Sequence, residues 1–314
     1  MIERIFNAIR RDGIFGTTNS LWGRFHCRFE NYTNLLNSDN HSVKLLHRQT
    51  KVYNRLFKKY KSIIDNDIPT EISPEHCNKV WICWFQGEEN APELIKCCIN
   101  SARKVMPDRE IVVITMDNLS QYATLPDYTI EKYKKGIIPA AQFSDLIRIE
   151  LLCRHGGIWI DSTVLCTDSA DQREVILNSD LFMYKVFDLE NSGDKPILAS
   201  NWLICAKANH PILMLTRKLL YKYWETSNYL DHYFIFHFFL AMAARKYSDL
   251  WDRIPSYNNS SPHTMIFELL SEYNEERWHQ LEKISDFHKL NRHNDFNTNR
   301  TTVYKHIIDT YKQQ

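Results

Sequence analysis

The stretch FSDLIRIELLCRHGGIWIDST, residues 143–163, carries the strongest structural signal in this chain. Its apolar residues recur at helical spacing as far as Leu152, and Pro139 just upstream predicts the start of the helix. Gly156 predicts its end, because glycine readily adopts the positive φ that closes many helices. The following letters, GIWID, are apolar and β-prone, and they predict a strand that ends at Asp161. A helix followed by a buried strand is half of an α/β unit.

The preceding residues supply the other half. KVWICWF at 79–85 predicts a first strand, and EIVVITMD at 110–117 predicts a second buried strand. Between them lies a helical apolar stripe, for which Asn90 is a candidate cap and Pro92 suits the first turn. A strand, a helix and a strand within so short a span favour a parallel sheet with right-handed crossovers. Later strands are predicted at 181–188 and 201–206, and helices at 210–226 and 231–247.

We therefore expect a Rossmann-like α/β domain with a mainly parallel sheet flanked by helices. Its predicted extent is 77–265, after a turn-rich linker. Residues 1–76 form a predicted N-terminal helical extension. Residues 266–314 form a predicted C-terminal helical segment that packs on the α/β domain.

Charge and composition exclude several classes of protein. Lys and Arg number 39 against 38 Asp and Glu, so no overall field attracts nucleic acid, and we expect no nucleic-acid partner. The eight cysteines form no CxxC pair, which favours reduced thiols over a disulfide framework or a zinc site. No apolar stretch approaches the roughly 20 residues of a membrane span, and no signal peptide is evident. We expect a cytoplasmic protein.

The first residues of the chain leave two interpretations open. Apolar residues recur there at helical spacing beside arginines, namely Ile2, Ile5, Phe6 and Ile9 with Arg4, Arg10 and Arg11. This pattern is typical of an amphipathic helix on a membrane surface, here the inner face of the plasma membrane. It is equally typical of a helix that packs on the main domain.

Three charged residues of the central stretch are candidates for a binding site. Ligands of open α/β sheets bind beyond the carboxyl ends of the strands, which is where Asp161 is predicted to lie. Asp145 and Arg148 are three residues apart on one helix and therefore share a face. On an otherwise apolar helix, such a pair faces a cleft more readily than open water. The structural alternatives are a turn residue for Asp161 and a surface ion pair for the other two.

The run AAQFSDLIRIELLCRHGGIWIDSTV resembles the core of the capsular polysaccharide synthesis glycosyltransferases, relatives of the DXD-containing sugar transferases and of the glucosylating toxins. Their shared pattern, SD-x-x-R-x-x-x-L-x-x-x-GG-x-x-x-D, is matched by Ser144, Asp145, Arg148, Leu152, Gly156, Gly157 and Asp161. The resemblance extends over roughly 79–265. It implies a GT-A fold and transfer of a sugar with retention of anomeric configuration.

The resemblance also implies roles for individual residues. Trp84 is expected to lie against the nucleotide base, and Asp145 to contact the ribose or the donor sugar. Arg148 is expected to hold the sugar or to orient the nearby carboxylates. Asn201 is expected near the anomeric carbon. The implied donor-binding set is Trp84, Asp145, Arg148, Gly157, Asp161, Ser162 and Thr163. The implied catalytic set is Asp161, Asn201 and Asp231, the last on the acceptor side.

The chain departs from the DXD pattern at one position. The second Asp is replaced, so the motif reads Asp161-Ser162-Thr163. A Mn²⁺ or Mg²⁺ ion, which in such enzymes neutralises the diphosphate leaving group, is nevertheless expected here. Its predicted ligands are Asp161, Thr163 and His263. The histidine is included because other sugar transferases use a histidine late in the chain as a metal ligand.

The prediction for function is hexose transfer from a nucleotide sugar, UDP-glucose or UDP-galactose, to a growing capsular or other surface polysaccharide repeat unit. The implied partners are the nucleotide-sugar donor and an oligosaccharide acceptor that is lipid-linked. One alternative is a degenerate transferase fold that acts as a non-catalytic carbohydrate-binding or assembly subunit. Another is a haloacid dehalogenase-like phosphatase. The D-x-D-x-T/V motif of such enzymes is partly matched by IWIDSTV of this chain.

Overall fold

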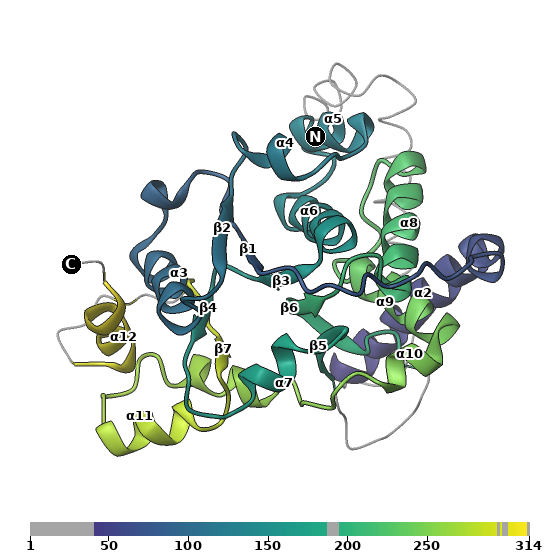
Figure 1. The fold of residues 1–314 in the computed structure, drawn as a ribbon. Helices are drawn as coiled ribbons and strands as arrows, with labels where there is room; N and C mark the ends of the chain where they lie inside the picture. The colour runs from purple at the N-terminus through teal and green to yellow at the C-terminus, as the bar shows by residue number, and fades with distance from the viewer. Residues whose placement is uncertain (1–40, 187–194, 294–295, 297–300, 313–314) are drawn as a thin grey trace.

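A five-stranded sheet of order β2-β1-β3-β6-β5 lies at the centre of the computed structural model, which describes residues 41–186, 195–293, 296 and 301–312 (Figure 1). The strands are β1 (Lys79–Cys83), β2 (Glu110–Ile114), β3 (Gly157–Ile160), β5 (Leu181–Lys185) and β6 (Ala199–Ala206). Strand β1 pairs in parallel with both β2 and β3, whereas β6 pairs antiparallel with β3 and β5. Strand β6 therefore runs against the other four. The predicted α/β architecture, a mainly parallel sheet flanked by helices, is confirmed.

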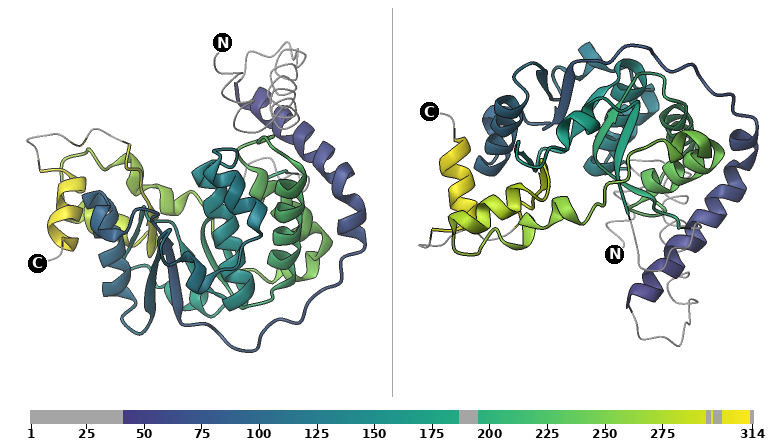
Figure 2. Two further views of the ribbon diagram at one scale, coloured as in Figure 1. Left: turned by 90° about the horizontal axis from the view of Figure 1, so that it is seen from above. Right: turned by 60° about the horizontal axis from the view of Figure 1, so that its bottom comes forward.

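Helices cover both faces of this sheet because its strands are apolar on both sides. Trp81 and Trp159 pack with α6 (Ala140–His155), α8 (Pro211–Thr226) and α9 (Ile235–Lys246). The alternate residues Ile82, Ile158 and Ile160 pack on the opposite face with α3 (Glu93–Val105) and α7 (Arg173–Leu177). This change of face at every residue is the period of two that strands impose. Figure 2 shows the two layers of helices with the sheet between them.

Three details differ from the prediction. Helix α3 is preceded by Pro92 as its cap, while Asn90 ends a short 3₁₀ turn (Glu88–Asn90) and donates its side-chain amide to the carbonyl of Gln86. Strand β2 is half-exposed because it forms the edge of the sheet. Helix α9 begins only at Ile235, since the residues before it form a turn.

The N-terminal extension includes a long helix, α2 (His41–Asp65). Its buried residues Val52, Leu56 and Tyr60 join the core that α8 and α9 form, and Figure 2 shows α2 lying along the outside of these helices. Here the extension packs on the main domain. The amphipathic pattern predicted at 2–11 lies outside the described residues.

The C-terminal segment contains more than the predicted helices. Helices α11 (Glu275–Glu282) and α12 (Val303–Tyr311) pack with α3 around a small core. Between them lies a strand, β7 (Phe287–Lys289), which pairs antiparallel with β4 (Val164–Cys166) directly after the central stretch. The prediction missed both strands because three residues are too few to display a period of two.

The cysteines and the apolar helices can be characterised over the part of the chain that the structure describes. All seven described cysteines are free thiols, and five of them are buried. Within the described ranges, no helix combines the length and the apolar character that crossing a membrane requires.

Candidate functional site

A pocket of about 220 Å³ opens at the carboxyl ends of β1 and β3. Six residues predicted from sequence line it: Asp145, Arg148, Asp161, Ser162, Thr163 and Asn201. The sheet brings them together, because parallel strands present their carboxyl ends at one edge and helix α6 lies directly behind that edge. Small-molecule sites usually measure about 300–1,000 Å³. The pocket is therefore smaller than a typical site for a whole small-molecule ligand.

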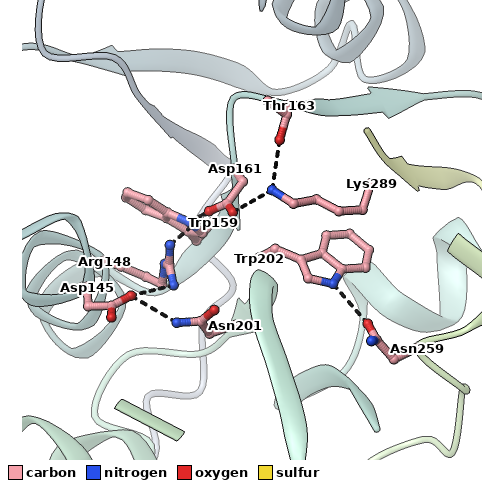
Figure 3. A network of polar contacts seen from close by, with 9 residues as sticks. All are labelled: Asp145, Arg148, Trp159, Asp161, Thr163, Asn201, Trp202, Asn259 and Lys289. Atoms are coloured by element: carbon pink, nitrogen blue, oxygen red, sulfur yellow. Dashed lines mark hydrogen bonds and ion pairs between the residues drawn. The ribbon is translucent and has the colours of Figure 1, made fainter. Parts of the chain in front are cut away.

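Arg148 lies at the centre of the polar network in this pocket (Figure 3). Its Nη1 donates to Asp145 Oδ1 and its Nη2 to Asp161 Oδ1, each at 2.8 Å. The guanidinium also stacks over the ring of Trp159, 4.7 Å from the centroid. The Arg148 side chain is only 5% exposed. A planar guanidinium with two carboxylates and an aromatic face is rigidly oriented.

Asp161 is held from three sides. Its Oδ1 accepts from Arg148 and from Trp159 Nε1, the latter at 3.0 Å, and its Oδ2 accepts from Lys289 Nζ at 2.8 Å. The Asp161 backbone N–H donates to the carbonyl of Trp202 on β6, which fixes the carboxylate at the end of β3. The carboxylate therefore faces the pocket, and it orients two cations there.

Asn201 reaches the same network from β6. Its side-chain amide donates to Asp145 Oδ1 at 2.9 Å, so one carboxylate oxygen accepts from both Asn201 and Arg148. These partners are far apart in sequence. The antiparallel pairing of β6 with β3 brings Asn201 beside α6.

The two carboxylates titrate in opposite directions. Burial raises the pKa of Asp145 to about 7, and the neighbouring Arg148 offsets only part of this rise. Burial also acts to raise the pKa of Asp161, but Lys289 and Arg148 together outweigh it, and the net pKa lies below the ordinary value. Asp161 is therefore ionised at neutral pH, whereas Asp145 exchanges its proton near neutrality.

This titration predicts a pH-dependent effect of Asp145→Asn on stability. Because the folded state holds the Asp145 proton more tightly than the unfolded chain, the contribution of this group is complete below the ordinary pKa of 3.8 and is lost as pH rises to about 7. Asparagine removes this loss. The melting temperature of Asp145→Asn relative to wild type should therefore rise between about pH 4 and about pH 7.

A second carboxylate gives the control. The hydrogen bond from Lys207 lowers the pKa of Asp180, so the contribution of Asp180 to stability is complete above its ordinary pKa of 3.8 and is lost only in stronger acid. The melting temperature of Asp180→Asn relative to wild type should therefore stay level between about pH 4 and about pH 7. Equal slopes for the two variants would contradict the assignment for Asp145.

Lys289 is the main residue of the site that the sequence did not reveal. Its Nζ lies 2.8 Å from Asp161 Oδ2 and 2.8 Å from Thr163 Oγ1 (Figure 3). It belongs to β7, in the segment predicted to contain only helices. No local pattern marks it, because its position depends on the pairing of β7 with β4.

Seven further residues that were not predicted as site residues line the pocket: Cys83, Ala141, Gln142, Ser144, Trp159, Tyr233 and His237. Tyr233 is 62% exposed, so it lies at the open side where a second substrate would approach. Burial lowers the pKa of His237 to about 3, and this histidine is neutral at ordinary pH. Burial raises the pKa of the Cys83 thiol to about 12, so it is no thiolate nucleophile.

Four predicted site residues lie outside the pocket lining, and the first two are Asp231 and Trp84. Asp231 is buried beneath the N-terminal extension, where its carboxylate pairs with Arg55 of α2 and its backbone N–H donates to the hydroxyl of Tyr223. The turn before α9 directs it there, outside the pocket lining, and its predicted role toward the acceptor stays a prediction. Trp84 packs against the core on the α3 face, with the guanidinium of Arg292 5.4 Å from its ring centroid. Its predicted contact with a base stays a prediction.

The other two such residues have structural partners. Gly157 is buried at the start of β3, and a Cβ atom there would lie 2.6 Å from the carbonyl oxygen of Lys79 on β1. It allows close strand packing rather than close approach of a ligand. His263 Nδ1 lies 2.7 Å from the carbonyl oxygen of Asn259, and its ring packs edge-on against Trp202.

The predicted metal ligands do not assemble into a donor set. Among the described residues, no three His, Cys, Asp or Glu side chains are grouped so that they can hold a metal ion. Asp161 and Thr163 both bind the same ammonium group, that of Lys289. Mg²⁺ and Mn²⁺ prefer several oxygen ligands, of which carboxylates contribute most of the charge. The side chains of this site therefore fit a divalent cation poorly.

Comparison with known proteins places the chain in a wider group. Residues 32–307 match the family described as "Capsular polysaccharide synthesis protein". A solved structure described as "PaToxG Glycosyltransferase" is similar with a TM-score of 0.36 and 14% identity, over 76% of this chain and 95% of that one. No curated protein matches the chain.

Proposed function

This chain belongs to the capsular polysaccharide synthesis protein family, and from that premise we propose that it is a glycosyltransferase, which moves a hexose from a nucleotide sugar to a growing surface polysaccharide with retention of anomeric configuration. The proposed donor is UDP-glucose or UDP-galactose. The proposed acceptor is a hydroxyl group of a lipid-linked oligosaccharide. The apolar and basic residues at 2–11 support a further proposal, contact of the enzyme with the membrane that holds this acceptor.

One observation carries the proposal. Arg148 joins two carboxylates, Asp145 and Asp161, within a pocket at the carboxyl ends of parallel strands. The carboxylate of Asp145 can accept hydrogen bonds from sugar hydroxyls, and the cations bound to Asp161 can bind phosphate oxygens. A nucleotide sugar presents both groups, a sugar joined to a diphosphate.

In the proposed reaction, the acceptor hydroxyl attacks the sugar C1 from the same face as that from which the leaving group departs. The bond between the sugar C1 and the β-phosphate oxygen breaks, and the nucleoside diphosphate leaves with the electron pair. The acceptor oxygen forms the new bond to C1, and its proton passes to a β-phosphate oxygen. The protein holds both substrates in reacting geometry and stabilises the negative charge of the leaving group.

The pocket disfavours a covalent intermediate on the enzyme. Each carboxylate that lines it is held in an ion pair with Arg148, and the Cys83 thiol keeps its proton. The same pairing weighs against a phosphatase, which needs a free aspartate nucleophile and a second aspartate as its acid and base. Thr163 stands in the place of that second aspartate.

A donor screen tests the function. The melting temperature of the chain is measured with UDP-, GDP- and CDP-sugars. Release of the free nucleotide is measured with and without oligosaccharide acceptors. A live transferase shows stabilisation by one class of donor and slow hydrolysis of that donor. Binding without turnover would favour a carbohydrate-binding or assembly subunit, and release of phosphate from monoesters would favour a phosphatase.

Replacement of Asp161 by asparagine sharpens this test. Asparagine keeps the shape but cannot hold Arg148 and Lys289 as ion pairs, so turnover should fall at least about 100-fold. Stabilisation by the donor should also be lost. The control, Asp180→Asn, removes a carboxylate that pairs with Lys207 outside the pocket and should change turnover less than about twofold. Full activity in Asp161→Asn would remove this residue from the mechanism.

A further inference from the structure

We propose that the ammonium group of Lys289 takes the place of the divalent metal in this enzyme and binds the diphosphate of the donor directly. The inference rests on the proposed function, and it names the group that neutralises the negative charge of the diphosphate leaving group. It makes the reaction independent of Mn²⁺ and Mg²⁺.

The position of Lys289 supports this role. Its Nζ donates to Asp161 Oδ2 and to Thr163 Oγ1, each at 2.8 Å, so it lies between the first and third residues of the DXD-like motif. Both of these residues line the pocket. The Lys289 side chain is 21% exposed, so solvent, and hence a ligand, can reach it. An ammonium group has three N–H donors, and two are accounted for by these contacts.

The replacement at position 163 fits the same interpretation. An aspartate there would pair with Lys289 and cancel its charge, whereas the Thr163 hydroxyl accepts a hydrogen bond and leaves the charge in place. The Asp161 carboxylate is shared between Lys289 and Arg148. With Asp145, which also pairs with Arg148, the site has two carboxylates and two cations, so no excess of negative charge is left to attract a metal ion.

The backbone fixes Lys289 in this place. In the pairing of β7 with β4, Lys289 lies opposite Val164, and the next N–H, that of Leu290, donates to the carbonyl of Thr163. The chain just before β7 is fixed as well, because the fully buried Asp286 accepts four backbone N–H donors from the loop at 169–173. A cation held this firmly needs little reorganisation when charge develops on the leaving group.

The chemical consequence is limited to one step. As the bond between C1 and the β-phosphate oxygen breaks, the electron pair stays on the diphosphate. The ammonium of Lys289 neutralises this charge by hydrogen bonding, and it neither gains nor loses a proton. The acceptor proton still passes to a phosphate oxygen.

The first experiment uses the wild-type chain. Release of UDP from UDP-glucose and UDP-galactose is measured in EDTA and in excess Mn²⁺, together with the shift in melting temperature that UDP causes. We expect rates that agree within about twofold and UDP stabilisation that does not need metal. Activity that disappears in EDTA and returns with Mn²⁺ would overturn the role of Lys289 and leave the proposed function intact. If no nucleotide stabilises the chain or is released under either condition, both proposals are wrong.

Variants at Lys289 give the second test. Lys289→Met removes the charge but keeps much of the side chain, and turnover should fall about 100-fold or more. Lys289→Arg should keep a measurable part of the rate. The control is Lys207→Met, because Lys207 makes a similar 2.8 Å ion pair with Asp180 and is 17% exposed, outside the pocket. If Lys289→Met loses no more activity than Lys207→Met, the inference fails.

A double variant adds a readout that a purely structural role would not give. Thr163→Asp combined with Lys289→Met restores the missing carboxylate and removes the competing ammonium. Its turnover should be at least about tenfold higher in Mn²⁺ than in EDTA, in contrast to wild type. If the double variant has equal turnover in Mn²⁺ and in EDTA while the wild type needs metal, Lys289 does not take the place of the metal ion.

Discussion

Arg148→Met should abolish measurable donor turnover and lower the free energy of unfolding by about 3–5 kcal/mol, the usual cost of breaking a buried ion pair. The change leaves the Asp145 and Asp161 carboxylates close together without the guanidinium that joins them. It also removes the cation stacked on Trp159. Denaturant unfolding and nucleotide release measure the two effects.

The loss of stability should depend on pH in a defined direction. Without Arg148, the pKa of Asp145 rises further, because burial and the charge of Asp161 both raise it. The variant should therefore be least destabilised in acid, where Asp145 is protonated, and most destabilised above neutrality. A loss of stability that does not vary with pH would show that Arg148 acts through packing alone.

Two comparison variants separate charge from geometry. Arg148→Lys restores the charge, but a single ammonium group cannot bridge two carboxylates as a planar guanidinium does, so activity should stay low while stability partly returns. Arg217→Met removes a guanidinium that pairs with Glu150 of the same helix α6, outside the pocket. It should reduce stability and leave turnover nearly unchanged.

Gly157→Ala should be the most damaging small substitution, with a loss of at least about 3 kcal/mol or failure to fold. Gly157 has φ of +93°, which an L side chain rarely adopts, and its added Cβ would lie 2.6 Å from the carbonyl oxygen of Lys79. That oxygen cannot move away, because it belongs to β1, which pairs with β2 and β3. Yield of soluble protein and denaturant unfolding measure the loss.

Gly87→Ala is the matched control. Gly87 also has a positive φ, +86°, but the atoms that an added Cβ would meet belong to the flexible side chain of Glu89. The cost should be confined to the backbone strain, about 1–3 kcal/mol. If the two alanine variants lose equal stability, the contact between β3 and β1 is not the cause.

The sequence alone determined those features that depend on neighbours along the chain. Helix α6, the turn at Gly156 and strand β3 follow from local periodicity and from glycine, and all three are present. The spacing of Asp145 and Arg148 placed them on one helix face, and they form an ion pair. Asp161 lies at the strand end, as the alternation of helix and strand predicted.

Tertiary structure decided which distant residues complete the site and which do not. Lys289 is 128 positions from Asp161 and Asn201 is 56 from Asp145, yet both join one network, because β7 pairs with β4 and β6 pairs with β3. Asp231, which the resemblance assigned to the site, pairs with Arg55 of α2 and lies outside the pocket lining. Local periodicity specifies the type of an element and the face on which a side chain lies, whereas strand pairing and helix packing set its distant neighbours. Those contacts depend on burial of apolar surface across the whole chain, which no short window of sequence contains.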